Sequence, residues 1–127
     1  MGEANRGRGG RPRRVAEEFL HAVSLLLASE VREAELGFVT LTGAEISPDL
    51  KNAVVFYSVL GDGVQQEKTE RVLNRVAHQL QGMAARQLKL RYTPRLVFRR
   101  DETIEKADRI ERLLKEIKDE HKDGQSG

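Results

Sequence analysis

Apolar residues recur at helical spacing in two long segments of the chain. In the first, residues 15–31, apolar side chains return every three or four positions, which predicts a helix that ends before Gly37. Pro12 suits the first turn of this helix, because that turn leaves its backbone N–H groups without partners and proline has no N–H. The second segment, residues 67–90, has the same period and predicts a second long helix.

Short runs of β-branched and aromatic residues predict three strands. Residues 38–46 and 53–60 are such runs, and the turn-forming stretch between them (SPDLKN) predicts a β-hairpin. Gly43 lies inside the first run and indicates a β-bulge. Residues 95–100 (RLVFRR) follow a helix-breaking Thr-Pro pair, and their alternation places arginines on one face of a third strand and apolar side chains on the other.

The remaining segments complete a single domain. Apolar positions between residues 104 and 117 predict a closing helix, for which Thr103 is the expected N-cap. The element order is therefore α-β-β-α-β-α. Its simplest arrangement is a small α+β domain, in which the third strand returns beside the hairpin and helices cover one face of the three-stranded sheet. We expect a disordered basic arm at residues 1–11, the domain at residues 12–118 and a disordered tail at residues 119–127.

A net charge of +2 conceals a strong sorting of charge along the chain. Residues 15–70 carry a net charge of −7, whereas residues 71–100 carry +8 and contain no acidic residue at all. Such sorting builds a local positive field that acts on polyanions. Arginine outnumbers lysine 15 to 7, and its planar guanidinium suits phosphate better than a point charge does. The pattern therefore favours a nucleic-acid contact surface.

The basic residues of the second helix lie opposite its apolar positions, so we expect them to form one exposed face. Gly82 lies in the middle of this face, although a glycine there costs about 1 kcal/mol of helix stability relative to alanine. It would either let a phosphate backbone approach closely or mark a bend. We predict nucleic-acid contacts from this face, from the neighbouring strand and from the start of the first helix. The predicted contact residues are Arg13, Arg14, Arg71, Arg75, Arg86, Lys89, Arg91, Arg95 and Arg99.

Two other interpretations of the basic residues stay open. Charged helix faces are often only solvated surface. The chain could also be a protein-interaction module that docks an acidic partner through its basic surface or through an exposed edge of the sheet. The salt dependence of binding separates an acidic protein from a nucleic acid, because counterion release from nucleic acid makes that dependence steep.

Few residues in the chain suit catalysis or metal binding. There is no cysteine, the three histidines show no metal-ligand spacing, and no phosphate-binding or dinucleotide-binding loop is present. We therefore expect no enzyme activity, no metal and no cofactor. No apolar run approaches the ~20 residues of a transmembrane helix, and two glutamates after the basic N-terminus argue against a signal peptide. We expect a cytoplasmic protein.

Three separated motifs in this chain resemble the bacterial ribosome-binding factor A family. They are residues 11–17 (RPRRVAE), residues 46–57 (ISPDLKNAVVFY) and residues 90–101 (LRYTPRLVFRRD). The closing helix is similar as well, so the resemblance covers about residues 11–118. It implies a type II KH-like domain whose second long helix is kinked, and the element order becomes α-β-β-α(kinked)-β-α.

The resemblance also implies a function. It implies that the chain associates with free 30S small ribosomal subunits and is needed for late maturation and processing of 16S rRNA, especially during growth in the cold. It further implies a noncatalytic monomer that contacts neither DNA nor membrane. The family lacks the GxxG loop of other KH domains and has an Ala-x-Gly helix kink instead. The corresponding residues here are Val76, Ala77 and His78, with Gly82 as the alternative position of the kink.

Overall fold

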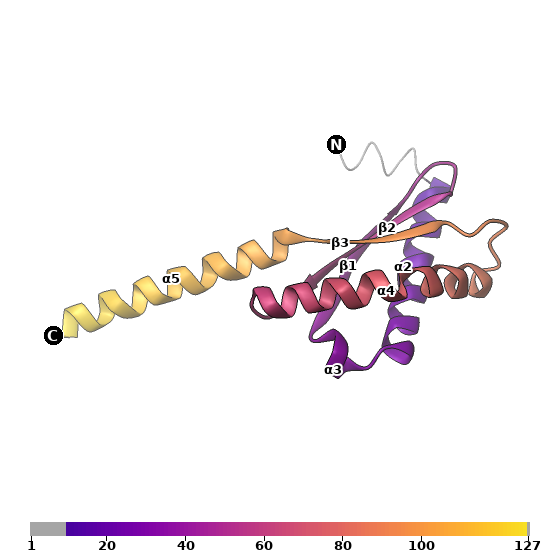
Figure 1. The fold of residues 1–127 in the computed structure, drawn as a ribbon. Coiled ribbons are helices and arrows are strands. Elements are labelled where there is room, and N and C mark those ends of the chain that lie inside the picture. The colour runs from indigo at the N-terminus through magenta and orange to yellow at the C-terminus, as the bar shows by residue number, and fades with distance from the viewer. Residues whose placement is uncertain (1–9, 127) are drawn as a thin grey trace.

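The computed structural model describes residues 10–126 and has the predicted order of elements with one short helix added. The elements are α2 (Gly10–Glu30), α3 (Glu33–Leu36), β1 (Val39–Ile46), β2 (Asn52–Val59), α4 (Gly63–Gln87), β3 (Arg95–Arg100) and α5 (Glu102–Ser126) (Figure 1). Most of the arm predicted at residues 1–11 lies outside the described residues, and α2 already includes residues 10 and 11.

The three strands form one sheet in the order β1-β2-β3. β1 and β2 are antiparallel, and the register between them shifts between Leu41 and Gly43, which confirms the predicted bulge. β3 lies parallel to β2, with Asn52 opposite Arg95. Parallel neighbours need a crossover connection. Here α4 provides it, so the third strand returns beside the hairpin as predicted.

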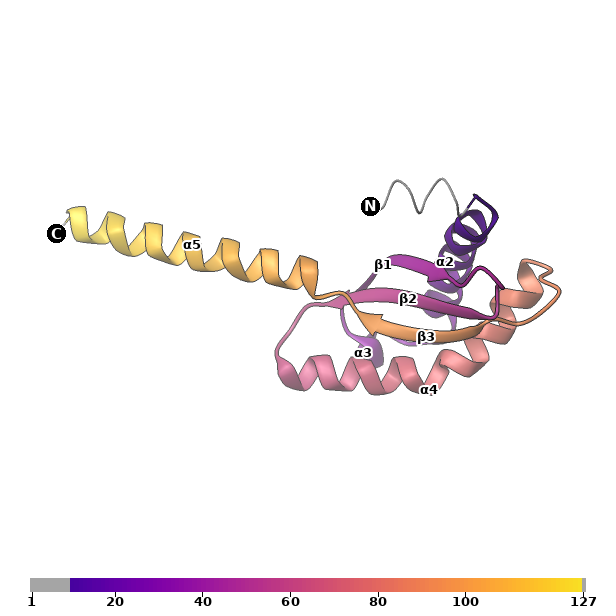
Figure 2. The ribbon, with the colours of Figure 1, turned by 90° about the horizontal axis from the view of Figure 1, so that it is seen from above.

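The core lies between one face of the sheet and the two long helices α2 and α4. Phe19 of α2 and Leu73 and Leu80 of α4 are completely buried there, against the inward side chains of β2 and β3. α2 packs mainly on β1, and α4 packs on β3 and on α2 (Figure 2). Within residues 10–126 no helix covers the other face of the sheet, which carries the partly exposed Phe56. The prediction of helices on one face is thus confirmed for α2 and α4.

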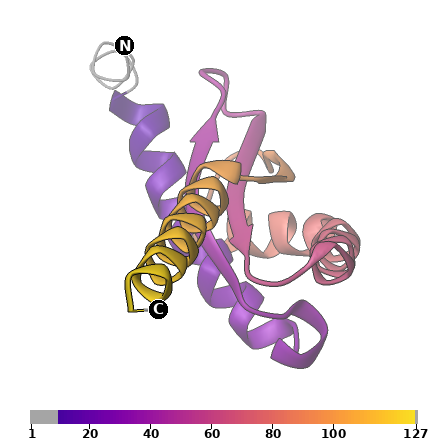
Figure 3. The ribbon, with the colours of Figure 1, turned by 90° about the vertical axis from the view of Figure 1, so that its left-hand side faces the viewer.

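The closing helix α5 departs from that arrangement, because it extends away from the sheet and from the other helices (Figures 1 and 2) and points toward the viewer in Figure 3. Its apolar stripe of Ile110, Leu113, Leu114 and Ile117 is more than half exposed. The helix also continues to Ser126, past the domain end expected at residue 118.

Two aspartates set the starts of α4 and α5 at positions that differ from the predicted ones. α4 begins at Gly63 rather than near residue 67, because the carboxylate of Asp62 accepts a hydrogen bond of 3.0 Å from the N–H of Gln65. α5 is capped by Asp101 rather than by Thr103, so the predicted cap is wrong. Asp101 accepts from the Thr103 N–H and from the Thr42 hydroxyl, both at 3.0 Å, and these bonds lower the pKa of its carboxyl group.

The end of α4 is a Schellman motif, a six-residue turn that normally places glycine after the helix cap. The N–H of Lys89 donates to the Arg86 carbonyl at 3.1 Å, and the N–H of Leu90 donates to the Ala85 carbonyl at 2.9 Å. Lys89 therefore occupies the left-handed region with φ of 54°. A lysine in that conformation is strained, because its Cβ approaches the backbone too closely.

α4 bends along its length (Figure 2). All four candidate kink residues, Val76, Ala77, His78 and Gly82, lie within this single continuous helix. A Cβ added at Gly82 would touch only the Arg86 guanidinium, at 3.4 Å, so this glycine is not required by close packing against another element. The residue at which the helix bends stays a prediction.

Replacing Leu80 by alanine should lower the free energy of unfolding by about 3–4 kcal/mol, because the side chain is completely buried and its removal leaves a cavity. Leu25→Ala is the matched control, since Leu25 is 54% exposed and its loss should cost only about 0.5 kcal/mol. Urea unfolding followed by circular dichroism measures both values. Equal losses would contradict the assignment of the core.

Replacing Lys89 by glycine should raise the free energy of unfolding by about 1 kcal/mol relative to Lys89→Ala. Both substitutions remove the same charge, but only glycine relieves the left-handed strain. Thermal and urea unfolding compare the two variants. If the glycine variant is no more stable than the alanine variant, Lys89 is not strained in the folded chain.

Candidate nucleic-acid interface

The ends of several elements meet at the end of the domain opposite the start of α5 (Figures 1 and 2). They are the first turns of α2, the β1–β2 turn, the last turn of α4 with its connection to β3, and the first residue of β3. The carbonyl of Lys51 accepts a hydrogen bond of 2.8 Å from the N–H of Arg95, which joins the β1–β2 turn to β3. We call this region the basic end. Its exposed basic residues are Arg11, Arg13, Arg14, Lys51, Arg86, Lys89, Arg91 and Arg95.

The fold thus brings together six of the nine predicted contact residues and adds two that were not predicted. Arg11 was assigned to a disordered arm, but it lies in the first turn of α2. Lys51 is a single basic residue in a turn-forming stretch, and no local pattern distinguishes it. Only the parallel pairing of β2 with β3 places Lys51 beside Arg95.

The other three predicted residues, Arg71, Arg75 and Arg99, lie away from the basic end. Arg71 precedes Arg86 by about four turns of α4, or about 22 Å. Arg75 lies beside α3, where its guanidinium is 3.1 Å from the Glu35 carboxylate. Arg99 lies opposite Phe56 on the sheet face without helices, about 13 Å along β3 from Arg95. The predicted residues therefore do not form a single face. Six of them lie together at the basic end, and three arginines lie outside it.

Local structure supports a positive potential at the basic end. The arginines in the first turn of α2 lie at the positive end of the helix dipole. That turn has no acidic residue to offset their charge. Arg13 lies 3.4 Å from Glu17, one turn further along the helix, and both side chains are more than half exposed. Such an exposed pair contributes little and leaves the arginine free to reorient. The basic end can therefore present several guanidinium groups to one polyanion.

One acidic residue lies within the β1–β2 turn at the basic end. Asp49 accepts a hydrogen bond of 2.6 Å from the Ser47 hydroxyl and one of 3.0 Å from the Lys51 N–H. These bonds, the Ser47 bond first, lower the pKa of the Asp49 carboxyl group. The Asp49 carboxylate thus stabilises the turn in which Lys51 lies.

Tyr92 is the exposed aromatic residue of the basic end. The residue is 61% exposed, and the guanidinium carbon of Arg91 lies over its ring, 5.5 Å from the centroid. This cation–π contact holds a planar cation against an exposed aromatic residue. Bases that are not paired in a duplex stack on such surfaces. The connection from α4 to β3 can therefore contact both phosphates and a base.

The opposite end of the domain is acidic. Residues 30–37 and 59–70 each carry a net charge of −2. Arg99 and Arg100 balance Asp101 and Glu102 where β3 meets α5, and Arg75 pairs with Glu35, so this end keeps a net charge of about −3. The register of the strands places these segments together, because Val39 pairs with Val59 and Tyr57 pairs with Arg100. A polyanion would consequently approach the domain from its basic end.

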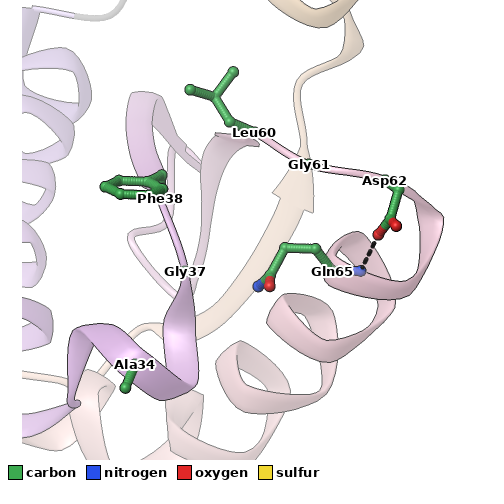
Figure 4. A pocket seen from close by; sticks show the side chains of 7 residues that line it. All are labelled: Ala34, Gly37, Phe38, Leu60, Gly61, Asp62 and Gln65. Carbon is green, nitrogen blue, oxygen red and sulfur yellow. Dashed lines mark hydrogen bonds between the residues drawn. The ribbon is translucent and has the colours of Figure 1, made fainter.

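Within the part of the chain that the structure describes, no group of three or more histidine, cysteine, aspartate or glutamate residues could bind a metal ion. The helices described are all too short or too polar to cross a bilayer. An open hollow of about 630 Å³ lies at the acidic end (Figure 4). Its one titratable lining residue, Asp62, accepts the hydrogen bond that caps α4.

The sequence matches the family model described as ribosome-binding factor A over residues 11–114. It is 42% identical over 117 residues to ribosome-binding factor A of Anaeromyxobacter sp. (strain Fw109-5), a match that covers 91% of this chain and 96% of the relative. It is 48% identical over 109 residues to that of Anaeromyxobacter dehalogenans (strain 2CP-C), covering 85% of this chain and 79% of the relative.

Solved structures show the same fold. The crystal structure of ribosome-binding factor A from Thermus thermophilus superposes with a TM-score of 0.61 at 20% identity, over 70% of this chain and 93% of that one. A homology model of Thermus thermophilus ribosome binding factor A, as fitted into the cryo-EM map of a 30S-RBFA complex, gives a TM-score of 0.60 at 20% identity, over 71% of this chain and 94% of that one. The family match, the relatives and the KH-like fold agree, and the chain belongs to the ribosome-binding factor A family.

Proposed function

We propose that this chain is an RNA-binding assembly factor, which associates with free 30S small ribosomal subunits and is needed for late maturation of their 16S rRNA. The basic end is the observation on which this proposal chiefly rests, because eight exposed basic residues from four separate elements converge there. A Thermus thermophilus relative with this fold has been fitted into a 30S-RBFA complex, which supports the same partner here.

The basic end would contact RNA in two ways. Arg13, Arg14, Arg86 and Lys89 would bind phosphates, since their charges are exposed and lie on helix ends. Arg91 and Tyr92 would contact a base that is not paired, because RNA is read mainly at such positions. The outlying Arg71, Arg75 and Arg99 would add weaker contacts along the flanks of the domain.

The mechanism is a bias on the folding of RNA. Binding free energy would hold an immature region of the small-subunit RNA in one conformation until neighbouring elements fold, after which the factor leaves. No bond is made or broken, so the function needs neither a cofactor nor catalytic residues. We expect it to act in the cytoplasm as a monomer, and to matter most in the cold, where misfolded RNA structures persist longer.

Protein docking through the edge of β3 is less favoured as the main function. An exposed edge strand binds another strand through its free N–H groups. The N–H of Leu96 already donates to the side-chain carbonyl of Gln81 on α4, at 2.8 Å. The edge is therefore partly occupied by the chain itself.

Reversing three charges at the basic end, in the combined variant Arg86→Glu, Lys89→Glu and Arg91→Glu, should weaken binding to purified 30S subunits at least about tenfold at 0.1 M salt. The slope of log affinity against log salt should fall by about 2, because the phosphate contacts of Arg86 and Lys89 and their released counterions are lost. Fluorescence titration of a labelled chain at several salt concentrations measures both quantities.

The matched control reverses three charges on α5, with Arg109→Glu, Lys115→Glu and Lys118→Glu. It changes the net charge by the same amount at positions far from the basic end, so binding should fall much less. Equal losses in the two variants would mean that only the overall charge matters. A nearly flat salt dependence of the unaltered chain would exclude RNA as its main contact.

A further inference from the structure

Large apolar side chains are exposed at the acidic end, around the hollow shown in Figure 4. Phe38 is 69% exposed and Leu60 is 63% exposed, and both line the hollow. They lie side by side just beyond the sheet, Phe38 before β1 and Leu60 after β2, and the N–H of Leu60 donates to the Phe38 carbonyl at 3.1 Å. Val64, in the first turn of α4, is 74% exposed. Apolar side chains that cluster in this way on a surface commonly mark a protein-binding site.

The hollow is kept open by two glycines that face Gln65. Gly37 has φ of 79° and Gly61 has φ of 133°, a region that other residues rarely adopt. A Cβ on Gly61 would lie 2.8 Å from the Cβ of Gln65, and a Cβ on Gly37 would collide with the Gln65 amide. Side chains at these two positions would therefore fill or distort the hollow.

The wall of the hollow is held in place by buried hydrogen bonds. The side-chain amide of Gln65 donates to the Thr69 hydroxyl at 3.1 Å, and that hydroxyl donates to the Leu36 carbonyl at 2.7 Å. Thr69 is completely buried. A site whose walls are fixed before binding loses less entropy on association, which favours affinity.

The charge around the hollow indicates the chemistry of its partner. The segments that form this end carry net negative charge, and RNA would be repelled there. A second copy of the chain would present the same acidic surface. The chain's own α5 (Glu102–Ser126) also carries a net charge of −2, so its exposed apolar stripe is a poor match. A basic partner complements the site, because opposite potentials across an interface favour encounter and register.

We propose that the hollow at the acidic end docks a basic segment of protein, which inserts an apolar side chain between Phe38 and Leu60. This inference rests on the proposed function, which brings the chain to the small subunit. On the small subunit, the basic end would contact rRNA while the opposite end contacts a basic ribosomal protein. The factor would then recognise a site where RNA and protein already lie side by side.

Photocross-linking tests which occupant contacts the hollow. The full chain with p-benzoylphenylalanine in place of Phe38 is bound to purified free 30S subunits, irradiated and analysed by mass spectrometry. We expect cross-links to a lysine- and arginine-rich segment of a small-subunit protein. Cross-links from position 38 to 16S rRNA, to α5 or to a second copy of the chain would overturn the proposal. The absence of any cross-link from this position would overturn it as well.

The same cross-linker at position 89 keeps this test separate from the proposed function. Position 89 lies at the basic end and should cross-link to 16S rRNA. If position 89 labels rRNA while position 38 labels no protein, only the docking proposal fails. If position 89 fails to label rRNA, the proposed RNA contact fails, whatever position 38 shows.

Substitution at the hollow provides an independent measurement. The double variant Phe38→Ser and Leu60→Ser should bind intact 30S subunits about fivefold or more weakly, because interface anchors of this size commonly cost that much. Its affinity for protein-free 16S rRNA should be unchanged. Leu25→Ser, at an exposed leucine on α2, is the matched control and should leave both affinities unchanged. Unchanged binding of the double variant to intact subunits, or equal losses on both targets, would contradict the proposal.

Discussion

Burial of the apolar sides of α2 and α4 against one face of the sheet determines where the other side chains of the domain lie. Phe19, Leu73 and Leu80 are completely buried in this contact. Because β3 lies parallel to β2, the chain has to return along the sheet before β3 begins, and α4 is the segment that returns. Its apolar side then faces the core and its arginines face solvent. The same constraint leaves the second face of the sheet without a covering helix in the described part of the chain.

Much of this fold could be predicted from periodicity, because burial in a small domain forces the hydrophobic pattern to follow the secondary structure. The long helices, the hairpin and the bulge at Gly43 follow from such local patterns. The starts of α4 and α5 do not, because they depend on which carboxylate reaches a free N–H. Asp101 caps α5 partly because the Thr42 hydroxyl, distant in sequence, orients its carboxylate.

The basic charge of the candidate interface was predictable from the sequence, but the positions of its residues were only partly so. The acid-free segment of residues 71–100 indicated a polyanion, but a count along the chain cannot show that α4 extends about 37 Å. That length separates Arg71 from Lys89 and gathers the basic residues at one end. Lys51 joins them only through the pairing of β2 with β3. The apolar hollow, likewise, depends on two glycines that approach Gln65 from different segments.

The central claim is that the two ends of the domain contact different kinds of surface on the small subunit. A cryo-EM map of this chain bound to the free 30S subunit, at a resolution that shows side chains, tests it most directly. We expect Arg86 and Lys89 against the 16S rRNA backbone, Arg91 against an unpaired base, and Phe38 and Leu60 against a basic segment of protein. A map in which the basic end faces solvent while another surface contacts the rRNA would contradict the account.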